Sequence, residues 1–344
     1  MIKYLSVIVI MCSSLCLAQS KKGVQSSESE VTVSTAETAE VALNAYIELR
    51  EGYKRSGTKQ FSRTEQFEMD DWCFDMQEKF PDAWQTDFAW YLNGHFYQER
   101  GDKILSAYKK APSDKRVVKS LYGYYGMKGE YGKQKELASK VIKYYSTNVL
   151  SYYEDVFPAT GVLIVSSEEE AIPLYALQQV KGKGKGVTVV NMDYLINDEY
   201  RKAMAHKLGT GSAKFFGEEK TFIKTSLASR NVHLSATVHQ AYLSSAADNT
   251  FLTGLYYEGY VKDQQDKLNT FWVSVATKNF ASMSLTSSEK RLYRNYLPPL
   301  LTLYKLKKTL GESDETLRKA IAVIAKKVEQ TKTVNEILTA YDNG

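Results

Sequence analysis

The chain has few cysteines, prolines and histidines, and it has no apolar run long enough to cross a membrane. Its 344 residues include three cysteines, six prolines and four histidines. If the first 18 residues are removed, Cys73 is the one cysteine left, and one cysteine cannot form an internal disulfide. The fold must therefore depend on its hydrophobic core, in which we expect Cys73 to be buried.

The charged residues exclude one class of partner. The 45 basic and 40 acidic residues give a net charge of +5, and they do not cluster as a nucleic-acid-binding surface requires. Apolar residues make up 43% of the chain, which supports a real core. The 25 tyrosines are typical of helical-repeat packing, carbohydrate contact and protein interfaces alike, so their number does not choose among these roles.

The first 18 residues have the pattern of a secretory signal peptide. Lys3 supplies the positive charge, about 14 mostly apolar residues follow, and small residues precede a cleavage point after Ala18. Spanning a bilayer takes roughly 20 apolar residues, so we expect no transmembrane segment in the mature chain. We expect the mature chain on the periplasmic or extracellular side of the cell envelope. A lipid anchor on Cys12 or Cys16 is the less favoured alternative, because bulky residues precede both cysteines.

A weak repeat indicates helical hairpins in the first half of the mature chain. Trp90, Gly94 and Tyr97 precede Gly101 with the spacing of the first helix of a tetratricopeptide repeat. Gly129 occupies the place of Gly101 in a second copy, which lacks the tryptophan and the small residue. The sequence therefore predicts hairpins that resemble tetratricopeptide repeats, without a regular array.

The pattern changes in the middle of the chain. Residues 161–165 (GVLIV) and 187–191 (VTVVN) are predicted strands, and their mostly apolar runs at 162–165 and 187–190 are typical of strands covered on both faces. A helix at about 169–180 and the turn KGKGKG lie between them, which predicts a right-handed βαβ unit with parallel neighbouring strands. Residues 231–238 and 255–261 are candidates for two further strands.

The predicted fold is therefore α/β plus all-α, a small, mainly parallel βαβ sheet domain flanked by tetratricopeptide-like helical hairpins. Helices are expected from about Thr35 to Phe157 and again from about Ser287. The chain divides into a signal peptide (1–18), a flexible linker (19–34), a helical domain (35–158), an α/β domain (159–265) and a C-terminal helical region (266–344).

Polar side chains follow the predicted strands. In open parallel sheets, ligands bind at the edge where the strands end, so we predict that these side chains converge and hold a cation or a polyol. Glu168 and Asp193 would be the carboxylate pair. No catalytic residue, metal ligand or cofactor is assigned, because no nucleophile elbow, phosphate-binding loop or zinc spacing is present. The candidate ligand-binding residues are Ser166, Ser167, Glu168, Asn191, Asp193 and His239.

A purely structural interpretation also accounts for the polar residues that follow the first strand. Ser166 and Ser167 each have a glutamate three residues later, which is the spacing of a capping box at a helix start. Acidic residues there also suit the positive end of the helix dipole. His233 and His239, six residues apart, are more typical of satisfied groups than of metal ligands. Both interpretations of the strand ends stay open.

The segments PLYALQQV, VTVVNMDYLINDEYRKAM, LTGLYYEGYV and RLYRNYLPPLLTLYK follow one another in this order. Together they resemble the soluble tail of a family of multi-spanning, glycosyltransferase-like membrane proteins common in Bacteroidetes, over about residues 158–310. The family's membrane-spanning catalytic half has no counterpart in these residues, and its Asn- and Asp-rich loop is replaced here by two serines and three glutamates. The resemblance implies a fold and a place in the cell envelope, and it implies no activity.

Two functions from different classes suit these patterns. The first is a non-enzymatic scaffold or binding module of the cell envelope, whose helical-repeat surfaces bind a protein or peptide. The alternative is an exported glycan-binding protein or hydrolase that uses the carboxylates at the strand ends. A pocket that gathers Glu168, Asp193 and His239 would favour the alternative, whereas an exposed aromatic groove on the helices would favour the binding module.

Overall fold

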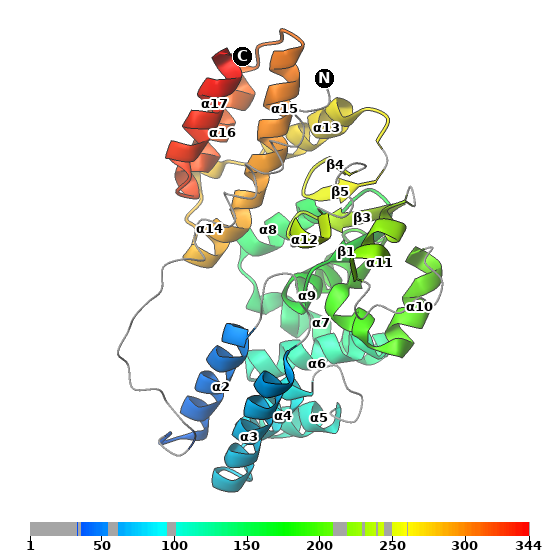
Figure 1. Ribbon diagram of the computed structural model, residues 1–344, viewed down its shortest axis with the longest axis vertical. Helices are drawn as coiled ribbons and strands as arrows, with labels where there is room; N and C mark the ends of the chain where they lie inside the picture. The colour runs from blue at the N-terminus through cyan, green and yellow to red at the C-terminus, as the bar shows by residue number, and fades with distance from the viewer. Residues whose placement is uncertain are drawn as a thin grey trace.

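The computed structural model describes residues 33, 36–53, 61–94, 101–208, 219–228, 231–238, 240–243, 250–259 and 261–343. The predicted signal peptide lies outside these residues, as do the linker except Val33 and the candidate residue His239. The described part is mostly helical and contains a five-stranded sheet. The sheet lies between the N-terminal helices and the C-terminal helices (Figure 1).

Local sequence signals explain where several of the helices before the sheet begin or end. Ser62 and Glu65 form a capping box at the start of one helix, which ends at Lys79, just before Pro81. Gly129, with a φ of 72°, makes a turn between two others, in a conformation that glycine adopts without strain. These helices are α2 (Ala39–Tyr53), α3 (Arg63–Lys79), α4 (Trp84–Asn93), α5 (Gly101–Lys110), α6 (Lys115–Met127), α7 (Tyr131–Val141) and α8 (Thr147–Val156).

The two central strands have the predicted bounds. β1 covers Gly161–Val165 and β2 covers Val187–Asn191, and α9 (Glu168–Ala176) lies between them with a π-helical turn (Leu177–Lys181). The other two candidates are shorter than predicted: they form β3 (Val232–Ser235) and β5 (Tyr256–Glu258). Among the described residues of this segment, the remaining elements are a 3-10 turn (Met192–Ile196), α10 (Asp198–Leu208), α11 (Glu219–Leu227), α12 (Gln240–Leu243) and β4 (Phe251–Leu252).

The sheet has the strand order β2-β1-β3-β5-β4 and is mixed. β1 pairs in parallel with β2 on one side and with β3 on the other, so the expected parallel pairing of the first two strands is present. β5 pairs antiparallel with both β3 and β4. The expectation of a mainly parallel sheet is therefore wrong for the last two strands. Only residues 253–255 separate β4 from β5, and a hairpin this short cannot make a parallel crossover.

The C-terminal helices begin close to residue 266, the predicted start of the C-terminal helical region, and earlier than the expectation of about Ser287. The first of them starts at Gln264, where Asp263 accepts a hydrogen bond from the amide of Asp266, and not near Ser287. Its buried residues Leu268, Phe271 and Val275 have helical spacing. The elements are α13 (Gln264–Ala276), α14 (Ser287–Tyr293), α15 (Leu297–Thr309), α16 (Glu315–Lys327) and α17 (Thr331–Asn343), with 3-10 turns at Phe280–Ser282 and Arg294–Tyr296.

Each face of the sheet packs on a different hydrophobic core. Leu163 and Val165 of β1 join a core that also contains α9 and the C-terminal helices. Val162 and Ile164 join a second core with α10, α11 and the N-terminal helices, in which Cys73 is fully buried as expected. Successive side chains of a strand point to opposite faces, so the continuous apolar run is explained by cover on both sides.

Among the described residues, we find no helix that combines the length and the apolar character needed to cross a membrane.

Candidate functional site

The carboxyl ends of β1 and β2 bring predicted site residues together. The backbone amide of Glu168 donates a hydrogen bond to Oδ2 of Asp193 at 3.1 Å, and the amide of Asp193 donates to Oδ1 of Asn191 at 2.9 Å. Asn191 is fully buried and Asp193 is half-buried. The parallel pairing of the two strands places these groups on one edge, as the topology predicts.

The capping-box prediction for this helix start is wrong in detail. Ser167 is the N-cap residue of α9, but its side chain makes no capping hydrogen bond. The Asp193 carboxylate accepts from the first helical amide, that of Glu168, in its place. Glu169, the predicted partner of Ser166, is exposed. A carboxylate from the neighbouring strand end therefore performs the capping that the local sequence assigned to serine.

Ser166 takes part in a second cluster that the sequence analysis did not predict. The buried carboxylate of Glu170 accepts hydrogen bonds from the amide of Ser166 at 3.0 Å and from its hydroxyl at 3.1 Å. It also accepts a hydrogen bond from Oγ of Ser235, the last residue of β3, and one from Oγ1 of Thr237, two residues later, at 2.6 Å. Four donors satisfy one buried carboxylate, so this cluster fastens the end of β1 to the end of β3.

Helix α6 covers the strand-end carboxylate. A Cβ atom at Gly123 of α6 would lie 2.1 Å from Oε1 of Glu168 and 2.5 Å from the hydroxyl of Tyr194. Glu168 is only 9% exposed as a result. The helical region therefore occupies the place where an open sheet would bind a ligand, and glycine permits this close approach.

Ionisable groups near Glu168 are partly buried between packed elements. Burial lowers the pKa of Lys119 on α6, and the negative charges of Glu169 and Glu168 oppose that shift. The ammonium of Lys119 lies 5.0 Å from the ring centre of Tyr145, a cation–π distance. Burial raises the pKa of Tyr145 well above its usual range, and the charges of the two glutamates add to the shift.

The histidines do not complete a strand-end site within the described residues. His239 lies outside them. Nε2 of His233 lies 3.2 Å from the carbonyl oxygen of Thr160, before the start of β1, and its Nδ1 lies 4.0 Å from Oε1 of Glu258. Burial lowers the pKa of His233, while the charge of Glu258 opposes that shift. In the part of the chain that the structure describes, no group of three or more His, Cys, Asp and Glu side chains could hold a metal ion.

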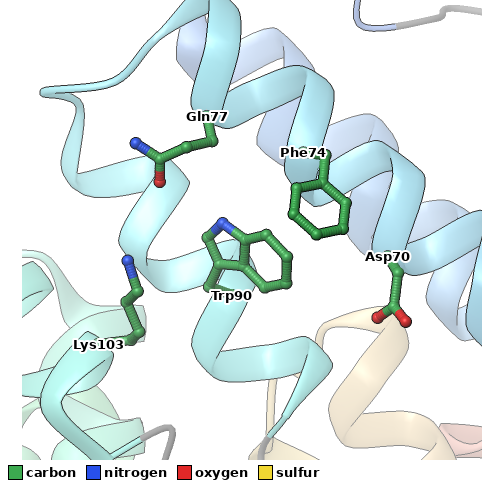
Figure 2. Close-up of a pocket in the computed structure, with 5 residues that line it drawn as sticks. All are labelled: Asp70, Phe74, Gln77, Trp90 and Lys103. Carbon is green, nitrogen blue, oxygen red and sulfur yellow. The ribbon is translucent and has the colours of Figure 1, made fainter.

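A hollow with a volume of about 310 Å³ lies on the N-terminal helices, away from the strand ends. Phe74 of α3 and Trp90 of α4 meet edge to face, with ring centres 4.9 Å apart and an interplanar angle of 82°. Figure 2 shows Phe74 and Asp70 on one side of the indole, and Gln77 and Lys103 on the other. Phe74 is 62% exposed, which is unusual for phenylalanine, whereas Trp90 is 6% exposed.

The polar rim of this hollow is held in place by hydrogen bonds. Oδ1 of Asp70 accepts from Nε2 of Gln66 at 3.0 Å and from Nδ2 of Asn93 at 2.5 Å. Nζ of Lys103 lies 3.5 Å from Oδ1 of Asp87. The hollow thus combines an exposed aromatic wall with positioned groups of both charge signs.

Comparison with protein-family models, with curated proteins and with solved structures finds no match for this chain.

Proposed function

We propose that this protein is an exported, non-enzymatic binding module of the cell envelope, which binds a protein or peptide through its N-terminal helices. The exposed Phe74 at the hollow of α3, α4 and α5 is the observation that carries the proposal. Exposed aromatic side chains next to positioned polar groups are typical of protein-binding surfaces. Nothing in this arrangement requires a catalytic group.

The proposed location in the cell envelope is inferred from the sequence alone. The pattern of residues 1–18 supports export, and the resemblance over about residues 158–310 to the soluble tail of a glycosyltransferase-like Bacteroidetes family supports an envelope role. We further propose that the hairpins α4–α5 and α6–α7 are relatives of tetratricopeptide repeats, since the two helices of each pair follow one another in the chain and pack together.

The alternative is an exported glycan-binding protein or hydrolase that uses the strand ends. It is supported by the proximity of Glu168 and Asp193, since the backbone amide of Glu168 donates a hydrogen bond to the carboxylate of Asp193. However, a hydrolytic carboxylate must reach its substrate, and Glu168 is buried beneath α6. The strand-end carboxylates are better explained as groups that join the sheet to the helices.

Site-specific photo-crosslinking tests the binding function. A benzophenone side chain replaces Phe74 in the full chain, and the control carries the same group at Val273 of α13, which is 68% exposed. We expect a discrete adduct with an envelope protein from position 74, identified by mass spectrometry, and no such adduct from position 273. Equal labelling from both positions, or no adduct from position 74, would refute the proposal.

A further inference from the structure

The outward face of α3 carries an aromatic row between two polar rows. Phe67 and Phe74 are seven residues apart, which places them two turns apart on one side of the helix, and they are 53% and 62% exposed. Asp70 and Gln77 have the same spacing and line the hollow on one flank of the aromatic row. On the other flank, Asp71 and Glu78 repeat this spacing and are both exposed.

This helix is strongly acidic, unlike the chain as a whole. It contains six acidic residues against Arg63 and Lys79, a net charge of −4, while the whole chain has a net charge of +5. Basic groups would be attracted to this face, and nucleic acids or anionic membranes would be repelled from it.

The hollow offers an anchor point beside these charges. Its aromatic wall, Phe74, is open to solvent, and Trp90 also lines it. Since Trp90 is only 6% exposed, its ring offers little flat surface on which a sugar ring could stack. An apolar side chain that enters from a partner segment would contact both rings.

We propose that the outward face of α3 docks a basic amphipathic segment of a partner protein. One apolar side chain of the segment enters the hollow beside Phe74, and Lys or Arg side chains lie over Asp70, Asp71 and Glu78. An amphipathic helix that lays its apolar face along Phe67 and Phe74 has the matching spacing. This inference rests on the proposed binding function and names the chemistry of the partner.

Two synthetic probe peptides test this inference with the full chain. One is an amphipathic peptide of Leu and Lys of about 18 residues, or about five helical turns, and the other has Glu in place of Lys. Fluorescence anisotropy of the labelled peptides gives the two dissociation constants. We expect the Lys peptide to bind at least about tenfold more tightly, and its affinity to fall as salt rises to about 0.5 M.

Matched variants separate a local effect from the net charge. Asp71→Lys with Glu78→Lys should weaken binding of the Lys peptide about tenfold, because it removes the acidic flank. The control, Glu312→Lys with Glu336→Lys, changes two exposed residues of the C-terminal region by the same total charge and should leave the affinity unchanged. Phe74→Ala should also weaken binding about tenfold.

Equal affinity for the two peptides, or equal losses in the two double variants, would overturn the inference. Unchanged affinity of Phe74→Ala would overturn it as well. A crosslink from position 74 without any preference for the Lys peptide would show that the partner chemistry is wrong while the binding function stands. Absence of the crosslink would instead refute the binding function itself.

Discussion

Gly123→Ala tests whether α6 is packed directly on the strand-end carboxylate. The new methyl group would lie 2.1 Å from Oε1 of Glu168 and 2.5 Å from the hydroxyl of Tyr194, both far below van der Waals contact. Glu168 is 9% exposed and Tyr194 is 1% exposed, so neither side chain can turn into solvent to make room. Helix α6 must therefore move away from α9, or the two buried side chains must shift.

Two opposing effects set the size of the change. Alanine is favoured over glycine inside a helix by up to about 1 kcal/mol. Overpacking of a buried site costs about 1 to 3 kcal/mol, and the site of Gly123 is buried. We expect the second effect to exceed the first, so that the variant loses about 1 to 2 kcal/mol of its free energy of unfolding.

Urea unfolding followed by circular dichroism measures this difference. The matched control is Gly132→Ala in the neighbouring helix α7, where a Cβ atom would meet nothing within 4 Å. This control should be stabilised by up to about 1 kcal/mol, since only the helix propensity changes. Opposite signs for the two variants are the expected result.

A double-mutant cycle with Glu168→Ala identifies the cause. If the Glu168 carboxylate blocks the new methyl group, Gly123→Ala should cost at least about 0.5 kcal/mol less when that carboxylate is absent. If Gly123→Ala is as stable as the unmodified protein or more stable, α6 does not lie on Glu168 as described. The strand ends would then be open rather than covered by α6.

Three further predictions concern other parts of the chain. Ile164→Asp should prevent cooperative folding in thermal unfolding experiments, because it places an unpaired charge in a fully buried strand. The lowered pKa of His233 means that the unfolded chain binds its proton more readily, so stability should fall as the pH drops below about 6.5, and His233→Gln should reduce that slope. A steeper slope in His233→Gln would contradict this assignment. N-terminal sequencing of the protein recovered from the envelope should begin at Gln19, and a chain that begins at Met1 in the cytoplasm would rule out export.

The sequence predicts the central strands well because their signals are local. Mostly apolar runs at 162–165 and 187–190 are each preceded by a glycine and followed by a polar residue, and both strands contain these runs with at most one more residue at an end. The length of their connection also predicts the parallel pairing that the structure has. The sequence did not predict the antiparallel direction of β5. That direction depends on the hairpin with β4, and β4 has only two residues, too few for a periodic signal.

The strand topology predicted which residues of the candidate site meet, but it did not predict that α6 covers them. Parallel strands that end at one edge explain why Asn191, Asp193 and Glu168 meet there. The cover by α6 depends on Gly123, 45 residues before Glu168, and no local pattern reveals that contact.

The outward face of α3 was missed for a different reason. The helix itself is clear from its capping box, but apolar side chains occur on both of its sides. Cys73 and Met76 are fully buried, whereas Phe67 and Phe74 are exposed. Residue preferences would not expose two phenylalanines in this way, so the orientation had to come from the packing of α3 on α2 and α4.

The tyrosines show why composition alone could not identify the surface that we propose for binding. Tyr152, Tyr293 and Tyr296 are fully buried and pack together where α8 meets the C-terminal helices. The hydroxyl of Tyr296 donates to Oδ2 of Asp155 at 2.6 Å, and that of Tyr293 donates to a backbone carbonyl of α8 at 2.9 Å. A buried tyrosine fills volume and still satisfies its hydroxyl at the rim of the core, which suits helices that must join a sheet. These three tyrosines therefore belong to the packing of the fold, whereas Phe67 and Phe74 of α3 are exposed.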